Sequence, residues 1–124
     1  MHEKFMRAAI RLSVQKMRQD QGGPFGAVVV RRGKIVGRGW NRVTTANDPT
    51  AHAEIAAIRE ACRRLRSFQL DECDLYTSCE PCPMCLAAIY WAVSYTHLLA
   101  HETPEHLVCR LPLEKNKTQQ ISPD

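Results

Sequence analysis

Hydrophobic residues recur every three to four positions over residues 2–19, which is the spacing of an amphipathic helix. The apolar stripe includes Phe5, Ala9 and Leu12, and polar side chains occupy most of the other positions. The sequence DQGGP at residues 20–24 ends this pattern, because Gly and Pro interrupt a helix. We expect this helix to pack against the rest of the domain and to carry no chemistry.

Two short apolar runs follow, at residues 25–30 and 35–40. They predict two strands that are joined by a turn at Arg32 and Gly33, and therefore a β-hairpin. The continuous sequence AVVV at residues 27–30 predicts that the first strand is covered on both faces, because a half-exposed strand would alternate apolar with polar residues.

A second helix is predicted after the polar loop at residues 41–48. We expect Asp48 or Thr50 to cap it and Pro49 to lie in its first turn. The helix separates apolar residues on one side from arginines on the other. The apolar residues are Ile55, Ile58, Ala61, Cys62 and Leu65, and the arginines, which we interpret as a solvated face, are Arg59, Arg63 and Arg66.

Residues 74–78 predict a third strand, and residues 83–92 predict a third helix. We expect Trp91 to lie in the core, Cys62 to be a buried apolar residue, and Cys73 to lie in a loop or at a strand edge. The element order α-β-β-α-β-α predicts an α/β domain in three layers, α-β-α, with no internal repeat.

Composition narrows the class of protein. A chain of 124 residues with 44% hydrophobic and 24% charged residues is typical of one soluble globular domain. No apolar run approaches the roughly 18 residues of a membrane span, and no signal peptide is visible. The net charge of +4 permits a nucleic-acid partner without indicating one. The cysteines cluster in a metal-like pattern, which favours a reducing, cytoplasmic location.

The candidate chemistry lies at the predicted starts of the second and third helices. Cys82 and Cys85 are three residues apart, so they share one face of a helix. The positive end of the helix favours their thiolate forms, which bind metal. With His52 they supply three ligands for zinc, which leaves a fourth position open for water. Glu54, two residues after His52, is close enough to act there without being a ligand.

One alternative reading of these residues is a structural zinc site. Cys79 continues the even spacing of Cys82 and Cys85, so the three cysteines and His52 could close a four-ligand site. We favour the three-ligand site, because Cys79 falls at a strand end before a proline and Glu54 would otherwise have no role.

Together the two segments HAE at residues 52–54 and PCPMC at residues 81–85 match the H-x-E and P-C-x-x-C signature of zinc nucleobase deaminases. From its first helix to Ala92 the chain resembles the cytidine deaminase superfamily. Within it, the chain is most similar to the guanine deaminases, through GGPFGA at residues 22–27, NDPTAHAE at 47–54, YTSCEPCPMC at 76–85 and IYWA at 89–92. Transfer-RNA adenosine deaminases resemble the middle portion nearly as well.

This resemblance implies a cytoplasmic zinc enzyme of purine catabolism that hydrolyses guanine to xanthine and ammonia. It implies Zn²⁺ on His52, Cys82 and Cys85, with Glu54 moving protons between water and the base. Substrate contacts are implied for Asn41 through a hydrogen bond to the base, for the Ala53 backbone and for Phe25. The implied partners are a small purine base and, in intact relatives, a second copy of the chain. Neither a membrane nor a nucleic acid is expected.

The alternatives are adenosine deamination in transfer RNA, deamination of another nucleobase or nucleoside, and a non-catalytic zinc-binding module. The family pattern stops after Ala92. We therefore predict a partial deaminase catalytic domain at residues 1–92, with a cytidine deaminase-like sheet that is incomplete at its C-terminus. Residues 93–124 resemble the translation of a sequencing-library adapter, and we expect them not to be native protein. Their His97, His101, His106 and Cys109 therefore receive no functional weight.

We accordingly expect the chain as written to bind zinc weakly and to show little deaminase activity, because the sheet would keep an exposed edge and the third helix would lack apolar cover. The test compares it with residues 1–92 fused to the C-terminal region of a related deaminase, with guanine as substrate. Cooperative folding and equal turnover of guanine by both proteins would show that residues 93–124 are real protein.

Overall fold

The computed structural model describes residues 3–20, 22–93, 97–98, 101–102 and 109–114. Its elements are α1 (Glu3–Arg18), β1 (Gly26–Arg31), β2 (Lys34–Trp40), α2 (Ala53–Leu65), β3 (Cys73–Thr77), α3 (Pro83–Val93), β4 (His97–Leu98), β5 (His101–Glu102) and β6 (Cys109–Glu114). The predicted ranges of α1, β1, β2, β3 and α3 agree with the structure to within one residue at each end. The predicted element order is therefore confirmed.

Antiparallel pairing builds the sheet in the order β2-β1-β3-β6-β4, and β5 also pairs with β6. The predicted hairpin joins β1 to β2. Its turn residues Arg32 and Gly33 both have positive φ, at 51° and 77°. Two successive positive φ values are the geometry that matches the twist of a tight hairpin.

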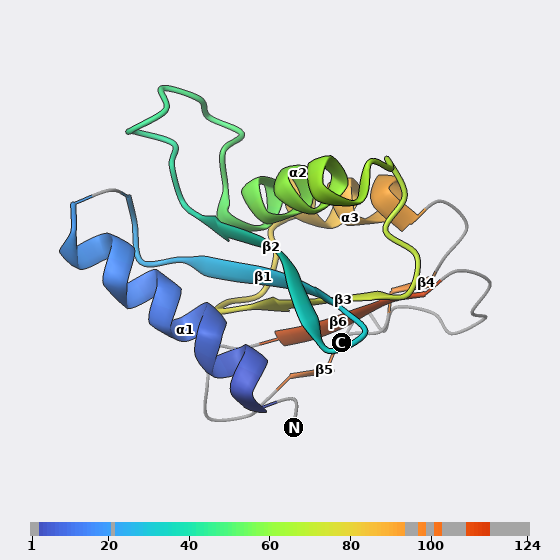
Figure 1. Ribbon diagram of the computed structural model, residues 1–124. Coiled ribbons are helices and arrows are strands. Elements are labelled where there is room, and N and C mark those ends of the chain that lie inside the picture. Colours follow the sequence, from blue (N-terminus) through green and yellow to red (C-terminus); the bar gives the residue numbers. More distant parts are fainter. Residues whose placement is uncertain (1–2, 21, 94–96, 99–100, 103–108, 115–124) are drawn as a thin grey trace.

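The sheet lies between α1 on one face and the pair α2 and α3 on the other, which confirms the three-layer prediction (Figure 1). Alternate residues of β1 enter two different cores. Ala27 and Val29 pack in the cluster formed with α2 and α3, whereas Val28 and Val30 pack in the cluster formed with α1. Residues 26–30 are all buried, so the prediction that this strand is covered on both faces is also confirmed.

Glycines allow α2 to lie directly on β2. A Cβ atom on Gly37 would overlap the carbonyl oxygen of Ala57, and one on Gly39 would overlap that of Ala53. Both alanines are buried in the same core cluster. Small residues on both elements therefore bring the helix backbone against the strand, and this close approach determines where the first turn of α2 lies.

Two expectations about the core are wrong. Trp91 is 83% exposed on α3, because Ile89 and Ala92 occupy the buried side of that helix. Cys73 is fully buried as the first residue of β3, an interior strand, rather than a loop or edge residue. Cys62 is partly buried and packs against the core, close to what we expected.

The edge of β3 that we expected to be exposed is paired with β6, with Cys73 opposite Leu113 and Thr77 opposite Cys109. That expectation is wrong, because a segment after residue 92 adds to the sheet. α3 does lack apolar cover, since Met84, Tyr90 and Trp91 are exposed. Most of residues 93–124 lie outside the described residues, so the hypothesis that they are not native stays a prediction. In the part of the chain that the structure describes, no helix is long and apolar enough to cross a membrane.

Candidate metal and catalytic site

The first turn of α2 supplies His52 and Glu54. The helix begins at Ala53 with His52 as its N-cap, so the expected cap at Asp48 or Thr50 and the placement of Pro49 in the helix are wrong. Asp48 instead forms a local turn. Its Oδ1 accepts two hydrogen bonds from Thr50, one from the Thr50 backbone N–H at 2.9 Å and one from the Thr50 hydroxyl at 2.8 Å. The His52 side chain makes no capping hydrogen bond. It is turned toward α3.

The first turn of α3 supplies the two cysteines. Pro83 is the first helical residue, a position where the missing N–H of proline costs nothing. Cys82 lies just before it, and its carbonyl accepts the helical hydrogen bond from Leu86 N at 2.9 Å. Cys85 is buried one turn further on. Both thiols therefore lie at the positive end of the helix, as predicted.

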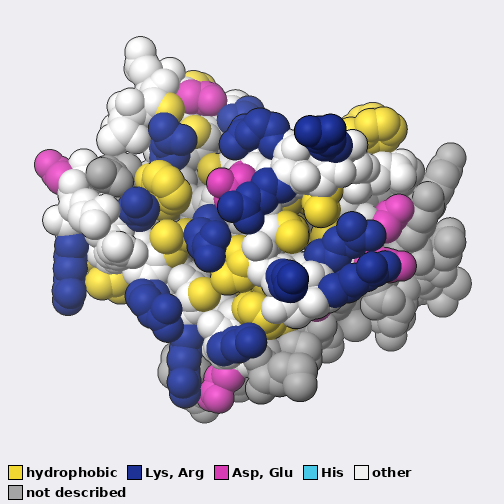
Figure 2. All heavy atoms as spheres, viewed as in Figure 1, with side chains coloured by type: hydrophobic (Ala, Val, Ile, Leu, Met, Phe, Trp, Pro, Cys, Tyr) yellow, Lys and Arg dark blue, Asp and Glu magenta, His cyan; other side chains and the backbone are white. Residues whose placement is uncertain are grey.

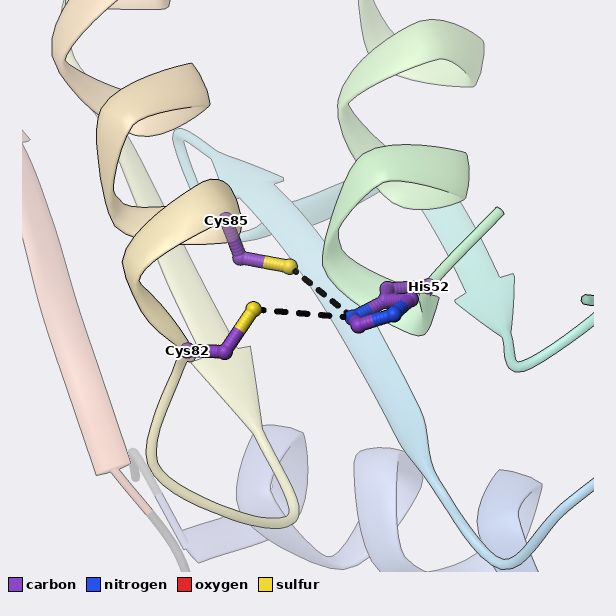
Figure 3. Close-up of side chains that lie close together, drawn as sticks. All are labelled: His52, Cys82 and Cys85. Atoms are coloured by element: carbon purple, nitrogen blue, oxygen red, sulfur yellow. Dashed lines mark hydrogen bonds between the residues drawn. The ribbon is translucent and has the colours of Figure 1, made fainter. Parts of the chain in front are cut away.

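The three predicted ligand residues meet between the two helix starts, where their side chains point toward one another (Figure 3). His52 Nδ1 lies 3.6 Å from Cys82 Sγ and 3.5 Å from Cys85 Sγ. Tetrahedral zinc with Zn–S of about 2.3 Å and Zn–N of about 2.0–2.1 Å would place nitrogen and sulfur roughly 3.6 Å apart. All three ligand atoms lie within 4.8 Å of one another. The two nitrogen–sulfur distances therefore match those expected around a zinc ion.

Burial makes negative charge costly in this site. Burial raises the pKa of the Cys85 thiol, and the neighbouring Glu54 carboxylate raises it further. Glu54 is only 5% exposed, and desolvation raises its pKa, although hydrogen bonds from its own backbone N–H and from Cys85 act in the opposite direction. The Cys85 Sγ and Glu54 Oε1 atoms are 3.6 Å apart. A divalent cation among these groups would stabilise their ionised forms, which is a second reason why the site suits zinc.

A cavity of about 220 Å³ opens beside the ligands. The predicted substrate contacts Phe25, Asn41 and Ala53 all line it, together with Glu54. The Asn41 carboxamide is oriented by its Oδ1, which accepts a hydrogen bond from Val43 N at 3.0 Å. The structure therefore brings every predicted site residue to one place.

Sequence reasoning gave little weight to three further residues of this region. Cys79 and Glu80 line the cavity, but Cys79 is not part of the metal-ligand group. Thr77 is buried at the end of β3. Its hydroxyl donates a hydrogen bond to the Cys79 carbonyl at 3.0 Å. Thr77 also acts to lower the pKa of Glu54. The sequence could have indicated Thr77, because it is a polar residue at the end of a buried strand that shortly precedes PCPMC.

Comparison with known proteins places these residues in context. A family model described as "Cytidine and deoxycytidylate deaminase zinc-binding region" matches residues 1–100. Guanine deaminase of Bacillus subtilis is 60% identical over 91 residues, which are 73% of this chain and 58% of that protein. An X-ray structure of guanine deaminase from Bacillus subtilis has a TM-score of 0.73 at 60% identity, covering 74% of this chain and 59% of that one.

A tRNA-specific adenosine deaminase of Aquifex aeolicus is 42% identical over 87 residues, which are 70% of this chain and 57% of that protein. The chain thus spans somewhat more than half the length of these two relatives.

The metal assignment predicts which cysteines zinc needs. Changing Cys82 or Cys85 to Ser should weaken zinc binding more than about 100-fold, because even the loss of an outer-shell partner commonly costs 10–100-fold. Cys79→Ser and Cys62→Ser, the matched controls, should keep the wild-type affinity. Zinc affinity measured by competition with a chromogenic chelator checks this. Loss of zinc in Cys79→Ser would contradict the three-ligand site.

Proposed function

The chain belongs to the family of cytidine and deoxycytidylate deaminases, and from this premise we propose that it catalyses the zinc-dependent hydrolysis of guanine to xanthine and ammonia. The observation that carries the proposal is a buried carboxylate, Glu54, beside a three-ligand zinc site in a small cavity. The choice of guanine rests on the 60% identity to guanine deaminase of Bacillus subtilis. A matched stretch of 91 residues in this chain necessarily includes residues 34–91, and therefore the three metal ligands, Glu54 and Asn41.

In the proposed mechanism, His52, Cys82 and Cys85 hold the zinc. A zinc ion held there by three protein ligands would leave a position for water and would supply water with a lowered pKa. Glu54 would accept a proton from the attacking water as its oxygen bonds to the carbon that carries the amine, and would deliver protons to the ring nitrogen and then to the amine as the C–N bond breaks and ammonia leaves. Its position supports this role, because Glu54 lines the cavity while one of its oxygens lies near the ligand Cys85.

Three further residues of the cavity lining are proposed to hold the substrate. We propose that the Asn41 carboxamide hydrogen-bonds the base, that Phe25 packs against it, and that the Ala53 backbone helps to orient it. All three residues line the cavity. A cavity of about 220 Å³ is smaller than the roughly 300–1,000 Å³ of sites for drug-sized ligands, which fits a single small base.

The runner-up is adenosine deamination in transfer RNA, which the similarity to the Aquifex aeolicus enzyme supports. Lys and Arg side chains are spread over the face that Figure 2 shows, interspersed with acidic and apolar ones. Among the described residues, Arg59 forms an ion pair with Asp48 at 3.5 Å, and Arg32 forms one with Glu72 at 3.4 Å. We interpret this face as solvated surface, so a free base is the preferred substrate. The cytoplasm is the proposed location, since thiol ligands and free cysteines suit a reducing compartment.

We also propose that the protein forms a homodimer through the outward face of α3. That face is apolar and exposed among the described residues, with Met84 at 36%, Tyr90 at 39% and Trp91 at 83% exposure. A helix that is apolar on all sides is normally buried, so an uncovered face of this kind suits a protein partner. A second copy is the proposed occupant because the resemblance to the guanine deaminases implies one in intact relatives.

The catalytic proposal predicts a specific effect of Glu54→Gln. This isosteric change removes the proton carrier and should lower guanine turnover about 10²–10⁴-fold, while zinc content stays at the wild-type level. Glu60→Gln, on the same helix, is the matched control and should not change turnover. Ammonia release and xanthine formation from guanine by the zinc-loaded chain are measured beside inosine formation in transfer RNA.

Inosine formation without xanthine formation would show that the substrate is adenosine in transfer RNA and not guanine. If wild type and Glu54→Gln bind zinc equally, and neither they nor residues 1–92 fused to the C-terminal region of a related deaminase release ammonia from guanine or form inosine, the site is a non-catalytic zinc module.

The dimer proposal predicts that Trp91→Glu weakens self-association at least about tenfold, because removing a central aromatic anchor commonly costs 2 kcal/mol or more. Ile10→Glu is the matched control. It changes a residue that is 39% exposed on α1, across the sheet from α3. Light scattering after size-exclusion chromatography gives the masses. A monomeric wild-type protein would refute the dimer, and a dimer that Trp91→Glu leaves intact would refute the α3 interface.

A further inference from the structure

Two cations lie over the indole ring of Trp40, the last residue of β2. Lys16 Nζ, from the last turn of α1, is 4.2 Å from the ring centroid, and Arg42 Cζ is 5.5 Å from it. A cation within about 6 Å of an indole centroid is attracted by the negative face of the ring, and Trp is the strongest such partner. The end of β2 is therefore attached to α1 by a directional contact.

The location of this contact follows from the packing of α1. Trp40 pairs with Gly26 across the hairpin, so the two residues face the same side of the sheet. A Cβ atom on Gly26 would overlap the carbonyl oxygen of Ala9, which shows that α1 lies directly on the sheet at that point. The absence of a side chain at Gly26 thus brings the last turns of α1 within reach of the Trp40 ring.

Trp40 is joined to the cavity through its neighbour Asn41. The backbone N–H of Asn41 donates to the carbonyl oxygen of Phe25 at 3.4 Å, and Asn41 and Phe25 both line the cavity. A Cβ atom on Gly22 would overlap the Asn41 carbonyl and come within 3.5 Å of Trp40 Cδ1, so this loop rests on both residues.

Arg42, which follows Asn41, also connects to the metal side of the cavity. Its backbone N–H donates to the Ala51 carbonyl at 2.9 Å, one residue before the ligand His52. The backbone on either side of Asn41 is thereby fixed, on one side by the Trp40 ring and on the other by this hydrogen bond.

We infer that Trp40, held by Lys16 and Arg42, is a positioning residue that sets the place of Asn41 and Phe25 on the substrate side of the cavity. Trp40 is absent from the residues that line the cavity, so it acts through Asn41. The inference rests on the proposed function, because it assigns Asn41 to the base. It concerns substrate affinity and leaves zinc binding and proton transfer to other residues.

The test uses the full zinc-loaded chain and two matched lysines of α1. Lys16 lies over Trp40, whereas Lys4 lies over Phe5 with its Nζ 5.0 Å from the ring centroid, at the other end of the helix. Lys16→Met should raise the KM for guanine about 2- to 5-fold, the factor that corresponds to a partly exposed cation–π contact. Trp40→Leu should raise it about tenfold, and Trp40→Phe should restore part of the loss. Lys4→Met should change nothing.

Three readouts separate positioning from general damage. The zinc content and kcat of each variant should stay within about twofold of wild type, because the metal ligands and Glu54 are not disturbed. In an Asn41→Ala background, Trp40→Leu should raise KM less than about twofold, since residues that act through one another are not additive. Without substrate, the amide protons of Asn41 and Val43 should exchange several-fold faster in Trp40→Leu and Lys16→Met.

The amide readout distinguishes the failure of this inference from the failure of the proposed function. If the wild-type protein does not turn over guanine but both variants show faster exchange, the positioning role is supported and guanine is refuted as the substrate. Unchanged exchange and unchanged KM in Lys16→Met and Trp40→Leu would overturn the positioning role. If Trp40→Leu does not fold, Lys16→Met against Lys4→Met still decides the question, because neither change alters a buried side chain.

Discussion

The close contact between α2 and β2 is the constraint on which the rest of the site depends. Gly37 and Gly39 have no side chain to hold the helix away, so the backbone of Ala53 and Ala57 lies against them, and the nearest helix side chains, those of Ala56 and Ala61, are small. The start of α2 is thereby held near the end of β2, where Asn41 follows. The metal side and the substrate side of the cavity are thus placed by one packing contact.

The ionisable groups of the site depend on one another for a different reason. Glu54 and Cys85 are buried side by side, and burial raises the pKa of each. Without a cation, burial makes the ionised form of each group less favourable than it is in water. A divalent cation would reverse this balance, and since the three ligands come from two helices, binding the metal would also join α2 to α3. Metal binding and the stability of the cavity are therefore expected to be coupled in this protein.

The two helices that flank the site have opposite surroundings. α2 is covered by the sheet on its apolar side and exposes arginines on the other, as Arg59 and Arg63 show. α3 buries Cys85 and Ile89 but leaves Trp91 exposed, and its sequence contains no charged residue. Among the described residues, α2 therefore has its apolar side covered, whereas α3 keeps an exposed apolar face.

The sequence by itself determined the bounds of α1, β1, β2, β3 and α3 and which residues gather at the candidate site. Residues 27–30 predicted a doubly covered strand, Pro83 predicted the start of α3, and the spacing of Cys82 and Cys85 predicted a shared helix face, because these signals depend only on local periodicity and backbone restriction. Only the tertiary structure decided three other matters. α2 begins after His52 because that residue is turned toward the cysteines of another helix. Trp91 is exposed because other residues fill the core side of α3, and β3 is interior because β6 pairs with it. Such outcomes depend on which distant segments meet, and a local pattern carries no information about that.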